Sequence, residues 1–440
     1  MSADPPAAPA GPRPSRHAWY VMGLMALTTA FNVADRNLLH ILIPPIQREL
    51  GASDTEMGWL VGMGFALVHN VAILPIAYWA DRGPRRLIIS GGLFLWSALT
   101  AVSGFAQSYW QLFAARVGVA AAESTGSAPV HSLLSDYFPL SHRATAMALI
   151  SIGGVTGIGL GLAVGGVVAQ DYGWRQAFFV FGVPGAIFSL LVFLTVREPQ
   201  RGGAEGRAEP LARAGLGETL RYLLGRRAYL HIVLASCFHI FASIGTTTWY
   251  PTYLHRVHGL DLKPLGLSYA LAGPVASVLG ALVAGRLADR LSQRDLRFSM
   301  WIPAVASILA LPFTLGFILW PAGANFEIAG SVLPQAMLFM VPGSFLAGFW
   351  SGPSLAMVLT IARPQMRALA SAITTGSYNL VGMGLGPLLV GYLSDRLAPR
   401  YGVDSIRYAL LVVCLAHGIG MLHNFLAVRP LRGDVAAGRA

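Results

Sequence analysis

Apolar stretches of about 20 residues recur along this 440-residue chain, separated by short polar connections. Each stretch is long enough to cross the ~30 Å hydrocarbon core of a bilayer as an α-helix. Within lipid, a helix satisfies all its backbone hydrogen bonds internally, which an isolated strand or loop cannot do. Charged residues form only 12% of the chain, whereas a soluble domain carries about 25%. The sequence therefore predicts an all-α, polytopic membrane protein.

We expect twelve transmembrane helices in two six-helix bundles. The spans cover residues 18–42, 56–80, 87–106, 110–135, 143–169, 175–196, 228–254, 264–288, 298–320, 332–361, 366–394 and 405–428. With a cytoplasmic N-terminus, 22 of the 31 Lys and Arg residues fall inside, 7 fall outside, and Arg36 and Arg116 lie within spans. The positive-inside rule explains this distribution and predicts that both termini are cytoplasmic. The net charge of +11 then needs no nucleic-acid partner.

Polar segments divide the chain further. The expected units are a disordered cytoplasmic tail (1–17), an N-terminal bundle (18–196), a cytoplasmic linker (197–227), a C-terminal bundle (228–428) and a second cytoplasmic tail (429–440). The end of the linker, GETLRYLLGRR, predicts a short amphipathic surface helix with its leucines toward lipid.

The two halves of the chain share a spacing. Gly51, Gly58 and Asp81–Arg82 recur 208 residues later as Gly259, Gly266 and Asp289–Arg290. A shared spacing across two apolar spans indicates a duplicated helical unit. Parallel halves that rock about a central site are one known transporter architecture.

Four charges stand inside long apolar segments of the first half: Asp35, Arg36, Arg116 and Glu123. Each costs at least ~2.5–3.5 kcal/mol at the centre of a bilayer, so such residues mark functional sites. Arg116 and Glu123 are seven residues apart and share one helix face. At ~1.5 Å per residue, Asp35 and Arg116 lie at similar depth and Glu123 lies near the midplane. We therefore expect an Asp35–Arg116 pair, with Arg36 as a second cation.

These residue types suggest roles. Arginine binds phosphate or carboxylate through a planar fork of donors, so Arg36 and Arg116 are candidate substrate ligands. A carboxylate in a low-dielectric cavity can exchange protons near neutrality, which favours Glu123 for proton coupling. Asp35 is either a second proton site or the counter-charge of the arginines. The alternative is an ion-pair network that only braces spans 1 and 4.

Further polar and aromatic residues complete the candidate substrate site. Asn32 and His40 extend the stripe of Arg36 along one helix face. In the second half, His239, Tyr250 and Tyr378 are candidate contacts, and Ser127 is a further one in span 4. The second-half aromatic residues either line an apolar wall for an acyl chain or pack between helices.

Two loops carry a shared signature. Gly285-x-x-x-Asp289-Arg290 and the region from Ala77 to Arg86 resemble the loop motif of the major facilitator superfamily. The resemblance implies that this motif holds the inward side shut, and a rocking switch does need polar latches that can break. The implied cytoplasmic gate residues are Asp81, Arg82, Arg85, Arg86, Gly285, Asp289 and Arg290.

Residues 18–200 resemble the spinster branch of that superfamily more specifically. The resemblance rests on Asp35-Arg36-Asn37, the Gly51–Gly58 stretch, the Arg116–Ser124 stretch, Ser135–Pro139, Gly173-Trp174-Arg175 and Arg197-Glu198-Pro199. It implies a bacterial homologue of lysolipid and sphingolipid transporters in the inner membrane.

We therefore expect a secondary active transporter that moves an amphipathic anionic or zwitterionic lipid-like substrate, of the lysophospholipid or sphingolipid type, across the membrane. We expect it to work by alternating access and to be coupled to protons. The alternative is a proton-coupled symporter of small organic anions, such as aromatic or sugar acids. No nucleotide-hydrolysing loop is present in the sequence. We expect no enzymatic activity, no cofactor and no metal, since Cys237 and Cys414 lack ligand spacing. Membrane lipids are the expected surroundings, and the protein is expected to be monomeric.

Overall fold

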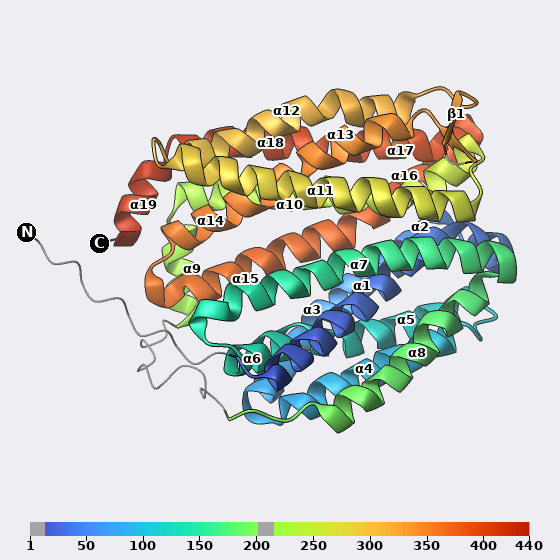
Figure 1. Ribbon diagram of the computed structural model, residues 1–440. Helices are drawn as coiled ribbons and strands as arrows, with labels where there is room; N and C mark the ends of the chain where they lie inside the picture. The colour runs from blue at the N-terminus through green and yellow to red at the C-terminus, as the bar shows by residue number, and fades with distance from the viewer. Residues whose placement is uncertain (1–13, 201–214, 329, 440) are drawn as a thin grey trace, which may run out of the picture.

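The computed structural model describes residues 14–200, 215–328 and 330–439, without the side chains of 81, 140, 141, 144, 368 and 439. Most of the expected N-terminal tail and residues 201–214 of the expected linker lie outside the described residues. The described chain is a bundle of long helices, with the first half at the bottom of Figure 1 and the second half at the top.

The first half contains six membrane-length segments, some of them interrupted. They are α1 (Arg16–Leu50); α2 (Asp54–Gly58), η1 (Trp59–Met63) and α3 (Gly64–Arg82); α4 (Arg85–Ser103); α5 (Tyr109–Glu123), η2 (Ser124–Gly126) and α6 (Ala128–Tyr137); α7 (Leu140–Tyr172); and α8 (Trp174–Thr195). The short helix α9 (Leu216–Leu224) follows.

The second half repeats this plan. Its elements are α10 (Arg227–His258); α11 (Leu262–Ser292); α12 (Phe298–Leu319); β1 (Asn325–Ile328) and β2 (Ser331–Pro334); α13 (Met337–Ala347), η3 (Gly348–Trp350) and α14 (Ser351–Ile361); η4 (Pro364–Met366), α15 (Arg367–Tyr378), η5 (Asn379–Leu385) and α16 (Gly386–Tyr401); η6 (Gly402–Asp404), α17 (Ser405–Cys414) and α18 (Ala416–Val428); and α19 (Leu431–Arg439).

Nine of the described segments are long and apolar enough to cross a membrane, and one of them, Leu369–Val428, covers two expected spans. The remaining two expected spans are α1 and the α5–α6 segment, which carry the four intramembrane charges. The twelve-span architecture is therefore confirmed. The start of α1 and the end of α19 lie at the same end of the bundle (Figure 1).

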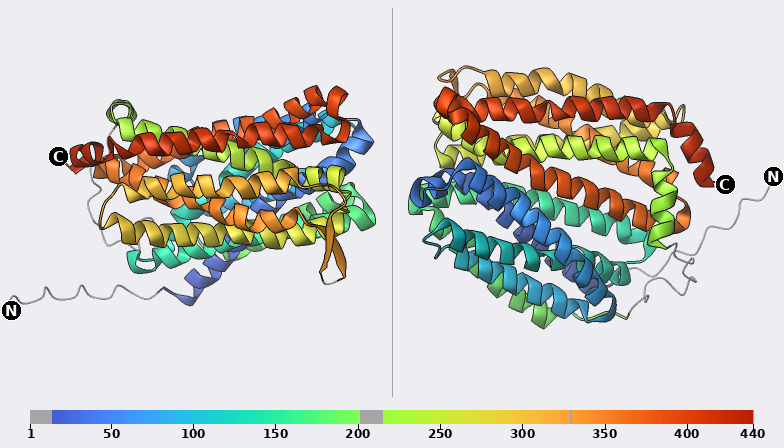
Figure 2. Two further views of the ribbon diagram at one scale, coloured as in Figure 1. Left: turned by 90° about the horizontal axis from the view of Figure 1, so that it is seen from above. Right: turned by 180° about the vertical axis from the view of Figure 1, so that it is seen from behind.

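Two elements differ from the expectation. An antiparallel hairpin, β1–β2, pairs Phe326 with Leu333 and projects from the opposite end of the bundle (Figure 2). Its eight strand residues are too few to have shown a clear alternating pattern. The segment expected as a cytoplasmic tail, 429–440, contains α19, in which Leu431 and Val435 are buried against the bundle.

The expected amphipathic helix exists as α9, but its orientation differs from the prediction. Leu223 is buried and packs in a cluster with Ile361 and Leu431, whereas Leu216 and Leu224 are exposed. The predicted lipid-facing row therefore turns partly toward protein, because α9 packs against α10 and α15 and Tyr222 donates to the carbonyl of Ile361 at the end of α14.

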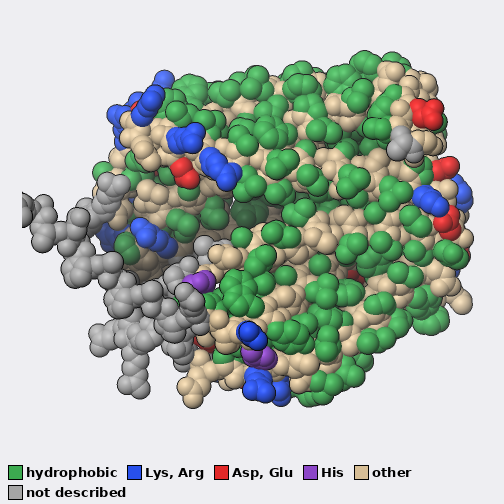
Figure 3. Space-filling view, in the orientation of Figure 1, with side chains coloured by type: hydrophobic (Ala, Val, Ile, Leu, Met, Phe, Trp, Pro, Cys, Tyr) green, Lys and Arg blue, Asp and Glu red, His purple; other side chains and the backbone are tan. Residues whose placement is uncertain are grey.

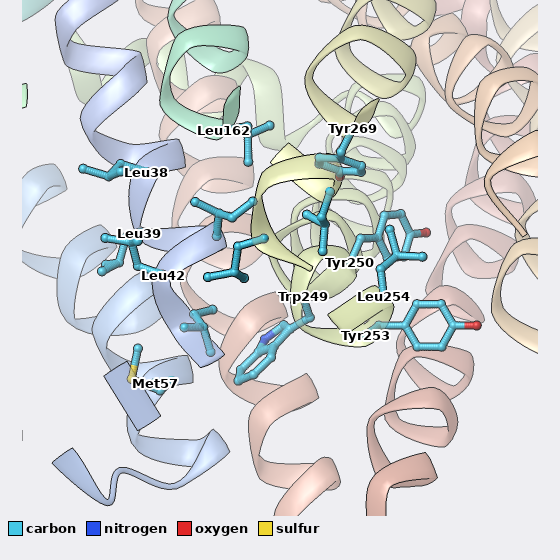
Figure 4. Close-up of a cluster of buried hydrophobic side chains, with 14 of the residues drawn as sticks. Leu38, Leu39, Leu42, Met57, Leu162, Trp249, Tyr250, Tyr253, Leu254 and Tyr269 are labelled. Carbon is cyan, nitrogen blue, oxygen red and sulfur yellow. The ribbon is translucent and has the colours of Figure 1, made fainter. Parts of the chain in front are cut away.

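The halves pack against each other chiefly at the hairpin end of the bundle. There α7 contacts α11, and α2 contacts α16. A large apolar cluster crosses this boundary and joins Leu38, Leu42 and Met57 of the first half to Trp249 and Tyr253 of the second (Figure 4). The indole of Trp249 also donates to the carbonyl of Pro387, at 2.9 Å.

The sequence repeat has a structural counterpart. Gly51 ends α1 and Gly259 ends α10, each in the left-handed conformation with φ 66°. This backbone conformation favours glycine and stops the helix. Gly58 packs against the backbone of α16, and Gly266 packs against the backbone of α7. The repeated glycines thus occupy equivalent turns and equivalent contacts between the halves.

The close approach of α7 and α11 allows a test. A Cβ at Gly166 would lie 2.4 Å from the carbonyl oxygen of Leu262, whereas a Cβ at Gly159 on the same helix meets nothing within 4 Å. We expect Gly166→Leu to push the halves apart at this end. Cysteines replacing Asp171 and Lys263, whose side chains now form an ion pair at 3.3 Å, should then crosslink several-fold less. Gly159→Leu is the matched control, and equal crosslinking in both variants would contradict the packing described.

Candidate functional site

The expected pair between α1 and α5 forms. Nη1 of Arg116 donates to both carboxylate oxygens of Asp35, at 2.8 and 3.1 Å. Both side chains are buried, with 2% and 4% of their surface exposed. Thr100 on α4 donates a further hydrogen bond to Asp35, at 2.8 Å. This pair therefore ties three helices of the first half together.

Arg36 forms a second pair with α5. Its Nε donates to Oε2 of Glu123, at 2.5 Å, and its guanidinium lies 4.8 Å from the ring centre of Phe65 on α3. The Arg36 side chain is 24% exposed, whereas that of Glu123 is fully buried. Arg36, expected as a second cation, is therefore itself paired, because Glu123 occupies one edge of its guanidinium.

The four charges cancel as two neighbouring pairs. Asp35 and Arg36 project about 100° apart from adjacent positions of α1, and their partners stand two turns apart on α5. Nε of Arg116, Oε1 of Glu123 and Nδ2 of Asn32 are buried without a hydrogen-bond partner among the described residues. These atoms can bind a water molecule, a proton or a polar substrate group.

A cavity of about 340 Å³ lies beside these pairs, between the two halves. The first half contributes its charged and apolar side, which includes Arg36, His40, Phe65 and Arg116. The second half contributes mostly hydroxyl and small apolar side chains. Those with a hydroxyl are Ser243, Thr247, Thr248, Tyr269, Ser277 and Ser344.

Two interrupted helices border this cavity. The π-helical segment η1 supplies Leu60 and Val61, and the π-helical segment η5 supplies Met383. The two segments meet closely, because a Cβ at Gly62 would lie 2.8 Å from the carbonyl oxygen of Gly384. Such π-helical turns occur frequently at functional sites.

The remaining candidates divide between this cavity and other places. Asn32 lies next to the η2 break, near Gly126, and His40 lines the cavity. Ser127 stands at the N-cap position of α6, makes no capping hydrogen bond with its side chain, and is exposed. Tyr250 and Tyr378 do not line this cavity: Tyr250 packs on Phe317, and Tyr378 packs edge-on to Trp350. Of the two interpretations of the second-half aromatic residues, helix packing is the one observed at these positions.

His239 belongs to a separate polar network inside the second half. Its Nδ1 lies 3.2 Å from Nδ1 of His417, and its Nε2 lies 3.0 Å from Nδ2 of Asn424. A second histidine pair, His231 and His423, lies along the same two helices, at 2.9 Å. His239 therefore joins α10 to α18 and does not reach the cavity beside the arginines.

The first gate motif is built into the first half. Arg85 is buried and pairs with Asp136 and, at 2.8 Å, with Glu198. The backbone N–H of Arg86 donates to Glu198, at 2.8 Å. Arg82 lies over the ring of Tyr78, and the side chain of Asp81 lies outside the described part of the structure. These contacts brace α4, α6 and the end of α8 within one half.

The second gate motif lies at the same end of the other half. Asp289 and Arg290 are exposed, and a Cβ at Gly285 would meet nothing within 4 Å. The described residues form two ion pairs between the halves, Arg256–Asp54 and Lys263–Asp171, and both lie at the hairpin end. A latch role for the motif at the opposite end remains a prediction.

The ion pair and hydrogen bonds that join the halves at the hairpin end, here called the latch, were not expected from the sequence. Arg256 at the end of α10 donates to both carboxylate oxygens of Asp54, at 2.5 and 2.7 Å, and also to Gln47. Asp395 on α16 accepts from the backbone N–H groups of Asp54 and Thr55 and so caps α2 from the opposite half. The one available signal was the Ser53–Glu56 capping box, which marks a helix start and not its partner.

The buried pair between α1 and α5 should be important for stability. Arg116→Ala leaves Asp35 as a buried carboxylate with Thr100 as its remaining donor, so we expect the free energy of unfolding to fall by about 3 kcal/mol. Asp35→Asn combined with Arg116→Gln removes both charges and should recover part of that loss. Unfolding of the purified proteins in one detergent measures both effects.

The exposed pair at the hairpin end provides the control for this comparison. Lys263→Ala should change the free energy of unfolding by less than about 1 kcal/mol, because Lys263 and its partner Asp171 are both exposed. Equal losses for Lys263→Ala and Arg116→Ala would show that burial of the α1–α5 pair does not matter.

Comparison with known proteins agrees with this architecture. The pattern of the Major Facilitator Superfamily matches residues 25–387. An MFS-type efflux pump of Mycolicibacterium smegmatis is 33% identical over 96% of this chain and 95% of its own. The sphingosine-1-phosphate transporter SPNS2 of Danio rerio is 26% identical over 89% of this chain and 80% of its own.

A solved structure has the same fold. It is that of a bacterial homologue of the human lysosomal transporter spinster, in an inward-facing and unoccupied conformation. It superposes with a TM-score of 0.84 and 24% identity over 96% of this chain and 98% of that one. Its fold and the bacterial relative agree with a multi-pass protein of a bacterial inner membrane. With two six-helix halves, a cavity between them and a match over most of its length, the chain belongs to the Major Facilitator Superfamily of membrane transporters.

Proposed function

We propose that this transporter moves an amphipathic anionic or zwitterionic lipid-like substrate, and that a proton on Glu123 accompanies the substrate. The observation that carries the proposal is the position of Arg36. Its side chain faces the cavity between the halves and at the same time donates to Glu123. Protonation of Glu123 and binding of an anion to Arg36 therefore both act on the one contact between these two side chains.

The two arginines differ in their availability. Arg116 is almost fully buried and is neutralised by Asp35 through two hydrogen bonds. Arg36 is partly exposed and makes one hydrogen bond to a carboxylate. An anionic head group can reach the free edge of Arg36 and form a forked contact there. In this proposal Arg36 is the main ligand, and Arg116 and Asp35 hold α1 and α5 in place.

Proton coupling follows from the second pair. When Glu123 is ionised, it holds Arg36 and reduces the positive potential that the cavity offers to an anion. When Glu123 accepts a proton, that attraction is lost and the full charge of Arg36 is available to the substrate. Proton binding and anion binding then favour each other, and by linkage the effect is reciprocal.

The opposite wall supports an amphipathic substrate. The described residues of the second half add no charge to the cavity, and their hydroxyls lie among apolar side chains such as Ile244 and Val278. A head group can bind at Arg36 while its chain lies against this wall. The similarity to a sphingosine-1-phosphate transporter and to a spinster homologue supports the same class of substrate.

The size of the cavity favours a second candidate, the small organic anions. About 340 Å³ is near the lower limit of the ~300–1,000 Å³ that is usual for small-molecule sites. Such a volume holds an aromatic or sugar acid completely, but only the head group and the first part of a lipid chain.

Glu123→Gln tests the coupling. The variant cannot ionise, so Arg36 stays free and substrate binding is retained, whereas dependence on a pH gradient should disappear. In the unmodified protein, apparent affinity for an anionic substrate should rise as the pH falls; in the variant it should not change with pH. Binding titrations and uptake into proteoliposomes measure the two effects. Unchanged proton-driven uptake by Glu123→Gln would refute the role of Glu123.

Ligand protection distinguishes the two substrate classes. A lysophospholipid should raise the thermal unfolding temperature of the purified protein, whereas benzoate or a sugar acid should not. Arg36→Ala should remove this protection, because it deletes the head-group ligand. Protection by the small acids alone would favour the second candidate, and lysophospholipid protection that survives in Arg36→Ala would place the site elsewhere.

A further inference from the structure

Two arginines from different elements meet on one tyrosine ring. The guanidinium of Arg226, just before α10, lies 4.5 Å from the ring centre of Tyr222 on α9. That of Arg363, between α14 and η4, lies 5.0 Å from the same ring centre. The hydroxyl of Tyr222 donates to the carbonyl of Ile361, at 3.1 Å, and fixes the ring in this position.

Neither guanidinium has an anionic partner among the described residues. The Nε atoms of Arg226 and Arg363 are buried and make no hydrogen bond to the residues that the structure describes. Asp434 of α19 accepts a hydrogen bond from the backbone N–H of Ala228, at 2.7 Å. The two guanidinium groups lie 4.5 and 5.0 Å from one ring centre, so they are at most about 10 Å apart and repel each other. An anion that contacts both would relieve this repulsion.

The surroundings favour an anion that carries apolar chains. Leu216 and Leu224 of the same helix α9 are 57% and 60% exposed. Several Lys and Arg side chains gather at this end of the molecule in Figure 3, as expected for the face that meets anionic lipid head groups. A free phosphate ion would use the arginines but not the leucines.

We propose that Arg226 and Arg363 bind the phosphate group of an anionic phospholipid, whose chains lie against the exposed leucines of α9. Each guanidinium donates N–H groups to the phosphate oxygens, and the ring of Tyr222 holds both in place. The bound lipid would connect α9, which follows the segment joining the halves, to the turn between α14 and η4. This site is separate from the cavity beside Arg36 and does not depend on the proposed substrate.

The test compares two double variants of the full-length protein in nanodiscs. Arg226→Gln with Arg363→Gln removes both proposed ligands, and Arg221→Gln with Arg227→Gln removes the same charge from exposed neighbours. Phosphatidylglycerol in phosphatidylcholine nanodiscs should raise the unfolding temperature of the unmodified protein and of the second variant. Its apparent affinity for the first variant should fall at least about tenfold. Equal responses of the two variants would overturn the site.

Two further arms keep the test interpretable. Arg226→Lys with Arg363→Lys retains both charges without the planar fork, so it should fold normally and bind phosphatidylglycerol more weakly than the unmodified protein. Full affinity in this variant would contradict the proposed contact. Inorganic phosphate added to phosphatidylcholine nanodiscs should give little protection. Protection equal to that of phosphatidylglycerol would identify a soluble anion as the ligand and overturn the lipid.

Discussion

Burying an ionised side chain away from water costs free energy, and this constraint shapes the first half of the transporter. Asp35 and Arg116 are buried together between α1, α4 and α5, and each is tolerated only because the other is present. The pair fixes the rotation of α1 about its axis. That rotation in turn directs the next residue, Arg36, toward Glu123 and the cavity. One buried ion pair thus positions the residue that we propose as the substrate ligand.

The sequence predicted the spans and this ion pair because both leave strong local signals. A run of twenty apolar residues and a charge inside it are visible without any tertiary contact. The Arg36–Glu123 pair was less visible, since it depends on which of two neighbouring side chains faces which turn of α5. The hydroxyl side chains that line the second-half side of the cavity left no signal in the sequence. Ser and Thr often donate hydrogen bonds to their own helix backbone, as Thr247 does to the carbonyl of Ser243, so their presence alone indicates no site. The latch of Arg256 and Asp54 joins two loop-proximal residues that are far apart in sequence.

The halves share a plan but differ in how they hold their helices together. In the first half, charged pairs connect the helices that border the cavity. In the second, the contacts from His417 through His239 to Asn424 join α10 to α18 without a carboxylate or a guanidinium. Such a half can be packed firmly without imposing a field on the cavity. The duplicated backbone, visible in the matching turns at Gly51 and Gly259, therefore carries two different kinds of chemistry.

The π-helical turns η1 and η5 also affect how these two spans are compared with others. A π-turn accommodates one residue more than an α-turn, so the pattern of faces shifts by one position, or about 100°, on passing through it. A helical wheel drawn continuously through Trp59–Met63 or Asn379–Leu385 assigns residues beyond the turn to the wrong face. The two spans must be divided at these turns before their cavity-facing residues are compared with those of any relative.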